Sequence, residues 1–199
     1  EHDNLNLDNC ISTLLAIHNI KFKKNIKNKN TINFIIGGPN KYFKFQQQTQ
    51  EKILNEIKFL SNDFKVNVIP SRRTPRGLIE ELSKIDNENI VTFDDLFNPR
   101  KYGELLSMGN LQVVTWDSIS MISEAISSEA GTFLFKFEEK FCPKRYLKFF
   151  DKITKLNLAK FYNQNLKPYE IHIDDYNKNL KTKILNKIQS NLRFRSSNA

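Results

Sequence analysis

The chain has 199 residues, of which 39% are hydrophobic and 12% aromatic, so it can bury the core of one large domain. No apolar run approaches the ~20 residues that cross a bilayer, which argues against a membrane-spanning segment. The formal net charge is +9, which fits either a compositional bias toward Lys, Asn and Ile or an attraction to anions such as nucleotides, acidic membranes or nucleic acid.

Apolar residues at helical spacing predict a leading helix over residues 5–20, and a Lys/Asn linker follows it. Beyond the linker, short continuous apolar runs predict strands, and amphipathic periodicity predicts helices. In chain order we expect strand 31–38, helix 46–61, strand 64–70, a helix opened by Pro75, strand 89–93, helix 99–108, strand 111–116, helix 117–128, strand 131–137, and helices 143–157 and 176–192.

Strands that alternate with helices of ten or more residues predict parallel β-α-β units and hence an α/β, Rossmann-like three-layer sandwich. We expect a leading helix and linker over residues 1–30, the Rossmann-like core over residues 31–157, and a C-terminal segment with a basic helix over residues 158–199. Ligands of such sheets bind beyond the carboxyl ends of the strands. Residues that directly follow the strands are therefore the candidates for a site.

Gly37 and Gly38 follow the first predicted strand, in "IIGGPNKYF". One interpretation is a loop that offers N–H groups to a phosphate or a sugar, because glycine lets the backbone approach a ligand closely. The other is a tight turn after a strand. The segment matches neither the GxGxxG dinucleotide fingerprint nor the P-loop.

The second candidate is "SRRTP", residues 71–75, at the start of a predicted helix. Thr74 suits the N-cap and Pro75 the first helical turn. Arg72 and Arg73 then stand at the positive end of the helix, where a cation is disfavoured by roughly 0.3–1 kcal/mol. Either they face a phosphate together with the helix N–H groups, or they lie over the surface of a solvated turn.

The third candidate is "TWDSISMISEA", residues 115–125, where a strand again passes into a helix. Asp117 or Ser118 can cap the helix, and Ser118 and Ser120 would line its mouth with hydroxyl groups. Glu124 lies on the same helix face as Ser120, where its carboxylate could accept two hydrogen bonds from a ribose diol. The alternative for Glu124 is an exposed helical glutamate, and Met121 can turn to the core.

Motifs of enzyme chemistry are absent from the sequence: it has no HExxH, no metal-ligand cluster and no GxSxG. The three histidines, His2, His18 and His172, are scattered. We therefore assign no catalytic residue, no metal and no cofactor. Cys10 and Cys142 are isolated, as expected of reduced thiols in a cytosolic-type compartment.

Basic residues gather in "KFKKNIKNKN", residues 21–30, and in "RFR", residues 193–195, which closes a Lys-rich helix. Neither cluster interleaves aromatic residues on a strand, so an RNA-reading surface is not favoured and no nucleic-acid partner is expected. Solvated faces or weak peripheral adsorption to a membrane remain open.

The glycine pair, "SRRTP" and "VTWDSISMISEA" together resemble the mitochondrial fission "elongated mitochondria" family, which has many bacterial members. "NPRKYGELLSMGNLQVV" and "KFFDKITKLNLAKFY" extend the resemblance through nearly the whole chain. Where the family usually has a Gly-Lys-Pro turn after this block, the chain has Glu129, Ala130 and Gly131. We expect the turn to be made through Gly131.

The resemblance implies the C-terminal lobe of a GT-B glycosyltransferase-like fold, the half that binds a nucleotide-sugar donor. The implied binding residues are Gly37, Gly38, Ser71, Arg72, Arg73, Thr74, Asp117, Ser118, Ser120, Met121, Ser123 and Glu124. Because the chain begins at Glu1 and an N-terminal lobe would be missing from it, we expect a fragment that binds the donor without turning it over. The expected location is the cytoplasm, with peripheral membrane contact left open.

The alternative function is a non-catalytic adaptor that uses the same fold to recruit a protein partner at a membrane. The plant member that names the family promotes mitochondrial division in this way, by recruiting a dynamin-related protein. A crevice with arginines and a hydroxyl-rich helix start would favour ligand binding over this role. Nucleic-acid binding is a third alternative, and it rests on net charge alone.

Overall fold

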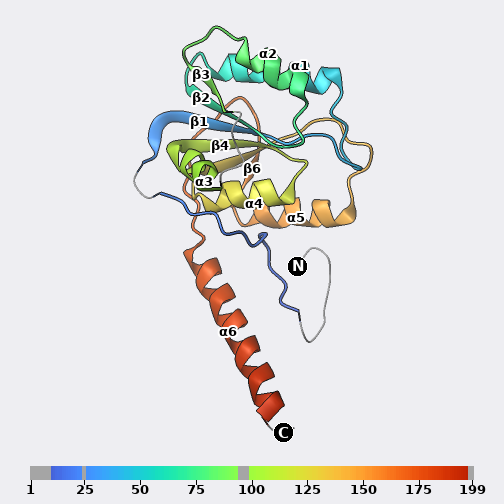
Figure 1. Ribbon diagram of the computed structural model, residues 1–199, viewed down its shortest axis with the longest axis vertical. Coiled ribbons are helices and arrows are strands. Elements are labelled where there is room, and N and C mark those ends of the chain that lie inside the picture. Colours follow the sequence, from blue (N-terminus) through green and yellow to red (C-terminus); the bar gives the residue numbers. More distant parts are fainter. Residues whose placement is uncertain (1–9, 24–25, 94–98, 197–199) are drawn as a thin grey trace.

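The computed structural model describes residues 10–23, 26–93 and 99–196 and forms one α/β unit around a six-stranded sheet (Figure 1). The strands are β1 (Asn28–Ile36), β2 (Lys65–Pro70), β3 (Ile90–Thr92), β4 (Gly109–Thr115), β5 (Gly131–Phe135) and β6 (Lys160–Phe161). They pair in parallel in the order β3-β2-β1-β4-β5-β6. This is the order of a doubly wound Rossmann sheet, so the predicted fold class is confirmed.

Helices cover both faces of the sheet (Figure 1). Helices α1 (Gln47–Leu60) and α2 (Arg76–Ser83) lie on one face, and α3 (Pro99–Met108), α4 (Ile119–Ser127) and α5 (Lys144–Lys155) lie on the other. The central strands β1, β2, β4 and β5 are therefore buried on both sides, which explains why apolar residues dominate both of their faces. Helix α6 (Asp174–Ser196) extends away from this body.

The switch point of the sheet lies between β1 and β4, because the chain leaves these neighbours toward opposite faces. After β1 it enters α1, and after β4 it enters α4 on the other side (Figure 1). Ligand-binding crevices of doubly wound sheets form at this point, outside the carboxyl ends of the two strands. The glycine pair and the start of α4 both border it.

A ladder of buried amide side chains crosses the centre of the sheet. Asn33 pairs in register with Asn67 and with Gln112 on the neighbouring strands, and all three side chains are buried. Asn33 Nδ2 donates to the Leu105 carbonyl (2.9 Å) and Gln112 Nε2 to the Leu106 carbonyl (2.8 Å). These bonds satisfy carbonyl groups near the end of α3, which passes into β4 without a loop.

The predicted leading helix is wrong for residues 10–20, which follow an extended, irregular path; residues 5–9 of that prediction lie outside the described residues. The backbone N–H groups of Leu14 and Leu15 donate to the Tyr176 hydroxyl, and that of Ala16 donates to Ser123 Oγ. Because these amides bond to other elements, they form no helical turn. We call residues 10–23 the N-terminal strap.

Three further differences concern two strands and a turn. Strand β1 begins within the predicted linker, and the two-residue β6 was not predicted. The turn after α4 is made by Glu129, whose φ is 58°, and Gly131 already belongs to β5. The expected role of Gly131 in the turn is therefore wrong, because the left-handed residue comes two positions earlier.

Candidate functional site

A cavity of about 790 Å³ opens beyond the carboxyl ends of the central strands. We call it the Arg72 cavity. Its walls come from the strap, from the ends of β1 and β2, from the segment after β2, from α3 and from α4. The lining residues are His18, Asn19, Ile20, Ile35, Ile69, Pro70, Ser71, Arg72, Arg73, Tyr102, Ser118, Ser120, Met121 and Glu124. Seven residues of the sequence-predicted site meet here: Ser71, Arg72, Arg73, Ser118, Ser120, Met121 and Glu124.

The first turn of α4 forms one wall. Ser118 is the N-cap, and its Oγ accepts from the Met121 amide at 3.4 Å. Ser120 is exposed, whereas Met121 is nearly buried. The amides at the start of a helix have no partner within the helix and carry positive partial charge. This wall therefore suits an anion.

Glu124 lies one turn further along α4, on the same face as Ser120. Its Oε2 accepts a hydrogen bond from the Tyr102 hydroxyl at 3.1 Å. Burial raises the pKa of the Glu124 carboxyl, and the Tyr102 bond partly opposes that shift. The alternative of a simply exposed glutamate does not hold, because the carboxylate faces a cavity and is half-buried.

Tyr102 was missed at the level of the sequence. It comes from α3, at the end of the crossover that places β4 beside β1, so nothing in the local pattern connects it with Glu124. Burial raises the pKa of Tyr102 well above its ordinary value, and the neighbouring carboxylate adds to this. The phenol therefore stays protonated and acts as a hydrogen-bond donor.

The two arginines have different surroundings. Arg73 pairs with Asp117, which is fully buried, at 2.7 Å between NH2 and Oδ2, and its NH1 donates to the Gly38 carbonyl at 2.7 Å. Arg72 is exposed and makes no hydrogen bond or ion pair within the described part of the chain. Arg73 thus neutralises a buried carboxylate, and Arg72 is the cation that remains available to a ligand.

At positions 37 and 38 only glycine fits, because other parts of the chain lie too close to the backbone to leave room for a side chain. A Cβ on Gly37 would lie 2.2 Å from both Asp117 carboxylate oxygens, and one on Gly38 would lie 1.9 Å from the Arg73 carbonyl oxygen. Their amides already donate to Thr115 Oγ1 (2.7 Å) and to Asp117 Oδ2 (3.2 Å). In this structure these N–H groups join the strand ends together and are not directed at the cavity.

Thr74 does not cap α2. The N-cap is Pro75 and has no side-chain cap, so the predicted capping role of Thr74 is wrong. Its hydroxyl instead lies within 2.8 Å of the Ile36 and Gly37 carbonyls and accepts from the Ser71 amide. Bonding to the end of β1 competes with capping, because one short side chain cannot reach both.

Ser123 lies apart from the Arg72 cavity. Its side chain is fully buried, donates to the Ile119 carbonyl at 2.8 Å and accepts from the Ala16 amide at 3.0 Å. It therefore holds the N-terminal strap against α4. The strap in turn carries His18 to the cavity wall, where burial lowers the pKa of the imidazole and its Nδ1 accepts from the Ile20 amide.

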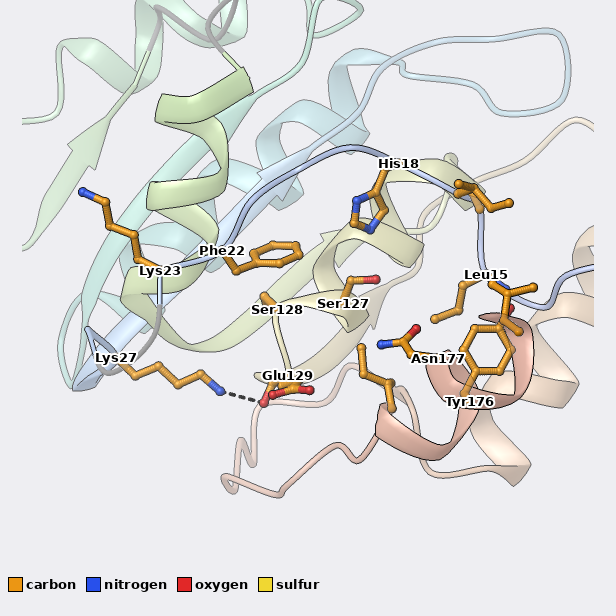
Figure 2. Close-up of a pocket in the computed structure, with 14 residues that line it drawn as sticks. Leu15, His18, Phe22, Lys23, Lys27, Ser127, Ser128, Glu129, Tyr176 and Asn177 are labelled. Carbon is orange, nitrogen blue, oxygen red and sulfur yellow. Dashed lines mark hydrogen bonds between the residues drawn. The ribbon is translucent and has the colours of Figure 1, made fainter. Parts of the chain in front are cut away.

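A second cavity, of about 800 Å³, lies at the opposite end of α4 (Figure 2). Its lining includes His18 and Phe22 of the strap, Lys27, Glu129 and Tyr176. Lys27 Nζ donates to the Glu129 carbonyl at 2.7 Å, and burial lowers the pKa of this lysine. The end of a helix carries negative partial charge, so this cavity suits a phosphate less well than the start of α4 does.

Neither a cluster of metal-ligating side chains nor a membrane-spanning helix is found among the described residues. These residues contain no group of three His, Cys, Asp or Glu side chains placed to hold a metal ion. Within the same part of the chain, no helix combines the length and the apolarity needed to cross a bilayer.

The family model described as Mitochondrial fission ELM1 matches residues 1–185. The chain belongs to this family. The resemblance predicted from the sequence motifs is thereby confirmed.

A relative in the bacterium Rickettsia prowazekii (strain Madrid E), named uncharacterized protein RP120, is 27% identical over 140 residues. The matched region covers 66% of this chain and 38% of that protein, so the match spans well under half of the relative's length. No solved structure matches the chain.

Proposed function

We propose that this chain binds a nucleoside diphosphate-sugar in the Arg72 cavity, as the donor-binding lobe of a GT-B-like glycosyltransferase-type protein. The observation that supports this most is that two features favouring an anion line one cavity. These features are the exposed Arg72 side chain and the start of α4, with Ser118 and Ser120. Both favour an anion at the switch point of the sheet.

Each part of the ligand would meet a different group. The diphosphate would lie between Arg72 and the first amides of α4, where a guanidinium can donate two parallel hydrogen bonds. Glu124 would accept hydrogen bonds from a ribose diol, and Tyr102 would hold its carboxylate in place. During transfer, charge that develops on the leaving diphosphate would be stabilised by Arg72 and by the dipole of α4. These residues bind and neutralise charge, and the base that activates an acceptor is not assigned.

Calorimetric titration of the 199-residue chain with UDP, GDP and ADP tests this proposal. We expect saturable binding of one nucleotide. Arg72→Ala should weaken it by roughly 1.5–3 kcal/mol, the loss of a hydrogen bond to a charged group. Arg76→Ala is the matched control, because Arg76 is an exposed arginine at the start of the same helix but does not line the cavity. Equal effects of the two substitutions, or folded protein that binds no nucleotide, would contradict the proposal.

The adaptor remains the second candidate because of α6. This helix extends away from the sheet and exposes Leu185 and Ile188, each about half accessible (48% and 51%). An apolar surface on a projecting element is a common feature of interaction sites. Absence of nucleotide binding in the titration would favour this candidate, whereas binding that depends on Arg72 would favour the donor-binding lobe.

A further inference from the structure

A smaller cavity, of about 320 Å³, lies beside the Arg72 cavity. We call it the Tyr42 cavity, because Lys41 and Tyr42 of the loop after β1 form one of its sides and Tyr146 of α5 forms another. Neither Tyr42 nor Tyr146 was among the site residues predicted from the sequence. We propose that this cavity holds the sugar of the nucleotide-sugar and that it admits one neutral or acidic monosaccharide; this inference rests on the proposed function.

The first argument is continuity. The two cavities share Arg73, Ser118 and Ser120, so they meet at the start of α4. A diphosphate on this helix start would have one end toward each cavity. The nucleoside would occupy the Arg72 cavity, which has more than twice the volume and contains Glu124. The group on the distal phosphate would then enter the Tyr42 cavity.

The second argument is the shape of the surface. The Tyr42 and Tyr146 rings lie 5.8 Å apart between centroids at 64°, and Tyr146 is nearly buried. They form an aromatic corner with polar groups around it, which is the usual make-up of a small-ligand pocket. Flat aromatic side chains can pack against the C–H face of a sugar ring, while the Ser120 hydroxyl and the Lys41 ammonium can bond to its hydroxyl groups.

The third argument is preorganisation. Asn40 Oδ1 accepts from the amides of Tyr42 (2.8 Å) and Phe43 (3.0 Å), and its Nδ2 donates to the Asp117 carbonyl (3.1 Å). The loop that carries Tyr42 is therefore attached to the start of α4. A surface that is already ordered loses less entropy when a ligand binds.

The fourth argument is charge. Lys41 lies 4.7 Å and Arg145 5.6 Å from the centroid of the Tyr42 ring, and Arg73 borders the same cavity. The carboxylate in its lining, Asp117, is fully buried and paired with Arg73. Cations therefore dominate the accessible surface. A neutral or carboxylated sugar suits this field, whereas an aminosugar with a free ammonium group is repelled.

The experiment compares each nucleoside diphosphate with its sugar conjugates by calorimetry on the full chain. The probes are UDP, GDP and ADP, their hexose conjugates, UDP-glucuronate and UDP-glucosamine. We expect one neutral or acidic conjugate to bind at least about tenfold more tightly than its parent diphosphate. Tyr42→Ala should abolish that advantage without changing the affinity for the diphosphate, and Tyr42→Phe, which keeps the ring, should retain it.

Phe59→Ala is the matched control, because Phe59 is an exposed aromatic residue of α1 outside both cavities. Equal affinity for diphosphate and conjugates, or an advantage that survives Tyr42→Ala, overturns the sugar site and leaves the proposed function intact. Tighter binding of UDP-glucosamine than of UDP-glucuronate overturns the charge argument. Failure of every diphosphate to bind overturns the proposed function and the sugar site with it.

Discussion

Arg72 and Arg73 illustrate how neighbouring residues of one type take on different tasks. The Arg73 guanidinium bonds to Asp117 and to the Gly38 carbonyl, so it connects the segments that follow β1, β2 and β4. A buried carboxylate without a partner would cost several kcal/mol, which is a sufficient reason for a cation at this helix start. Arg72 has no such task, so its side chain is left for a ligand.

Glu124 allows a prediction about pH. Burial raises the pKa of its carboxyl above the ordinary 4.5, so between 4.5 and the raised value the folded protein holds a proton that the unfolded chain has released. Stability that comes from this group is present at lower pH and is lost as the pH rises through that window. Glu124→Gln cannot ionise, so its unfolding free energy should increase relative to wild type across the window, by at most about 1.4 kcal/mol per pH unit.

Urea unfolding of both proteins at several pH values from about 4 upward, in steps of ~0.5 over the range where a buried carboxyl titrates, measures this difference. Glu80→Gln is the matched control, because it makes the same chemical change on an exposed face of α2. If Glu124→Gln and Glu80→Gln changed the unfolding free energy relative to wild type with the same pH dependence, the prediction would be contradicted.

At the scale of the elements, the site depends on how closely the strand ends approach. The loop after β1 contacts both the segment before α2 and the start of α4 through Gly37 and Gly38. Space, and not a left-handed backbone, makes glycine necessary here, because no glycine of the described residues has a positive φ. A side chain at either position would push these segments apart and widen the site.

Gly38→Ala tests this packing. The new Cβ would overlap the Arg73 backbone, and we expect a loss of at least about 1–3 kcal/mol in the free energy of unfolding, as overpacking typically costs. Gly77→Ala is the control: a Cβ added there, in α2, would have nothing within 4 Å, so the better helix former should stabilise by up to about 1 kcal/mol. Urea denaturation measures the unfolding free energy of both variants. If Gly38→Ala stabilised the protein as Gly77→Ala does, the close approach of the strand ends would not be what requires glycine at position 38.

At the scale of the whole molecule, the N-terminal strap joins parts of the chain that are far apart in the sequence. The Tyr176 hydroxyl at the start of α6 accepts from the amides of Leu14 and Leu15, both of which are buried. The strap then passes Ser123 and brings His18 to the Arg72 cavity. One wall of the candidate site therefore depends on contacts made near the other end of the described chain.

Tyr176→Phe should loosen the strap, because two buried amides lose their acceptor at about 1–3 kcal/mol each. We expect hydrogen exchange at residues 14–16 to accelerate by about tenfold or more, while the amides of β1 stay protected. In the control Tyr169→Phe, the lost hydroxyl contacts the Thr132 backbone in β5, so the strap should be unaffected. Unchanged exchange at residues 14–16 in Tyr176→Phe would show that the two bonds do not hold the strap.

The alternation of apolar strands and amphipathic helices was enough to predict the parallel sheet, because each of these patterns is local. The prediction failed where local pattern and tertiary bonding compete. Leu14, Leu15 and Ile20 have helical spacing, yet the strap is extended because its amides bond to Tyr176 and Ser123. Thr74 is a good N-cap by type, yet its hydroxyl bonds to the end of β1.

The sequence by itself determined the fold class, the family and the three loops at which a site should lie, since these follow from periodicity and from motifs within single segments. Only the tertiary structure decided the role of each side chain in those loops. It paired Arg73 with Asp117 and left Arg72 exposed, directed Ser123 to the strap, and brought Tyr102 to Glu124 and Tyr42 to the start of α4. The physical reason is that hydrogen bonds and ion pairs depend on distance in space, and residues of distant segments meet only after the strands have ordered themselves in the sheet.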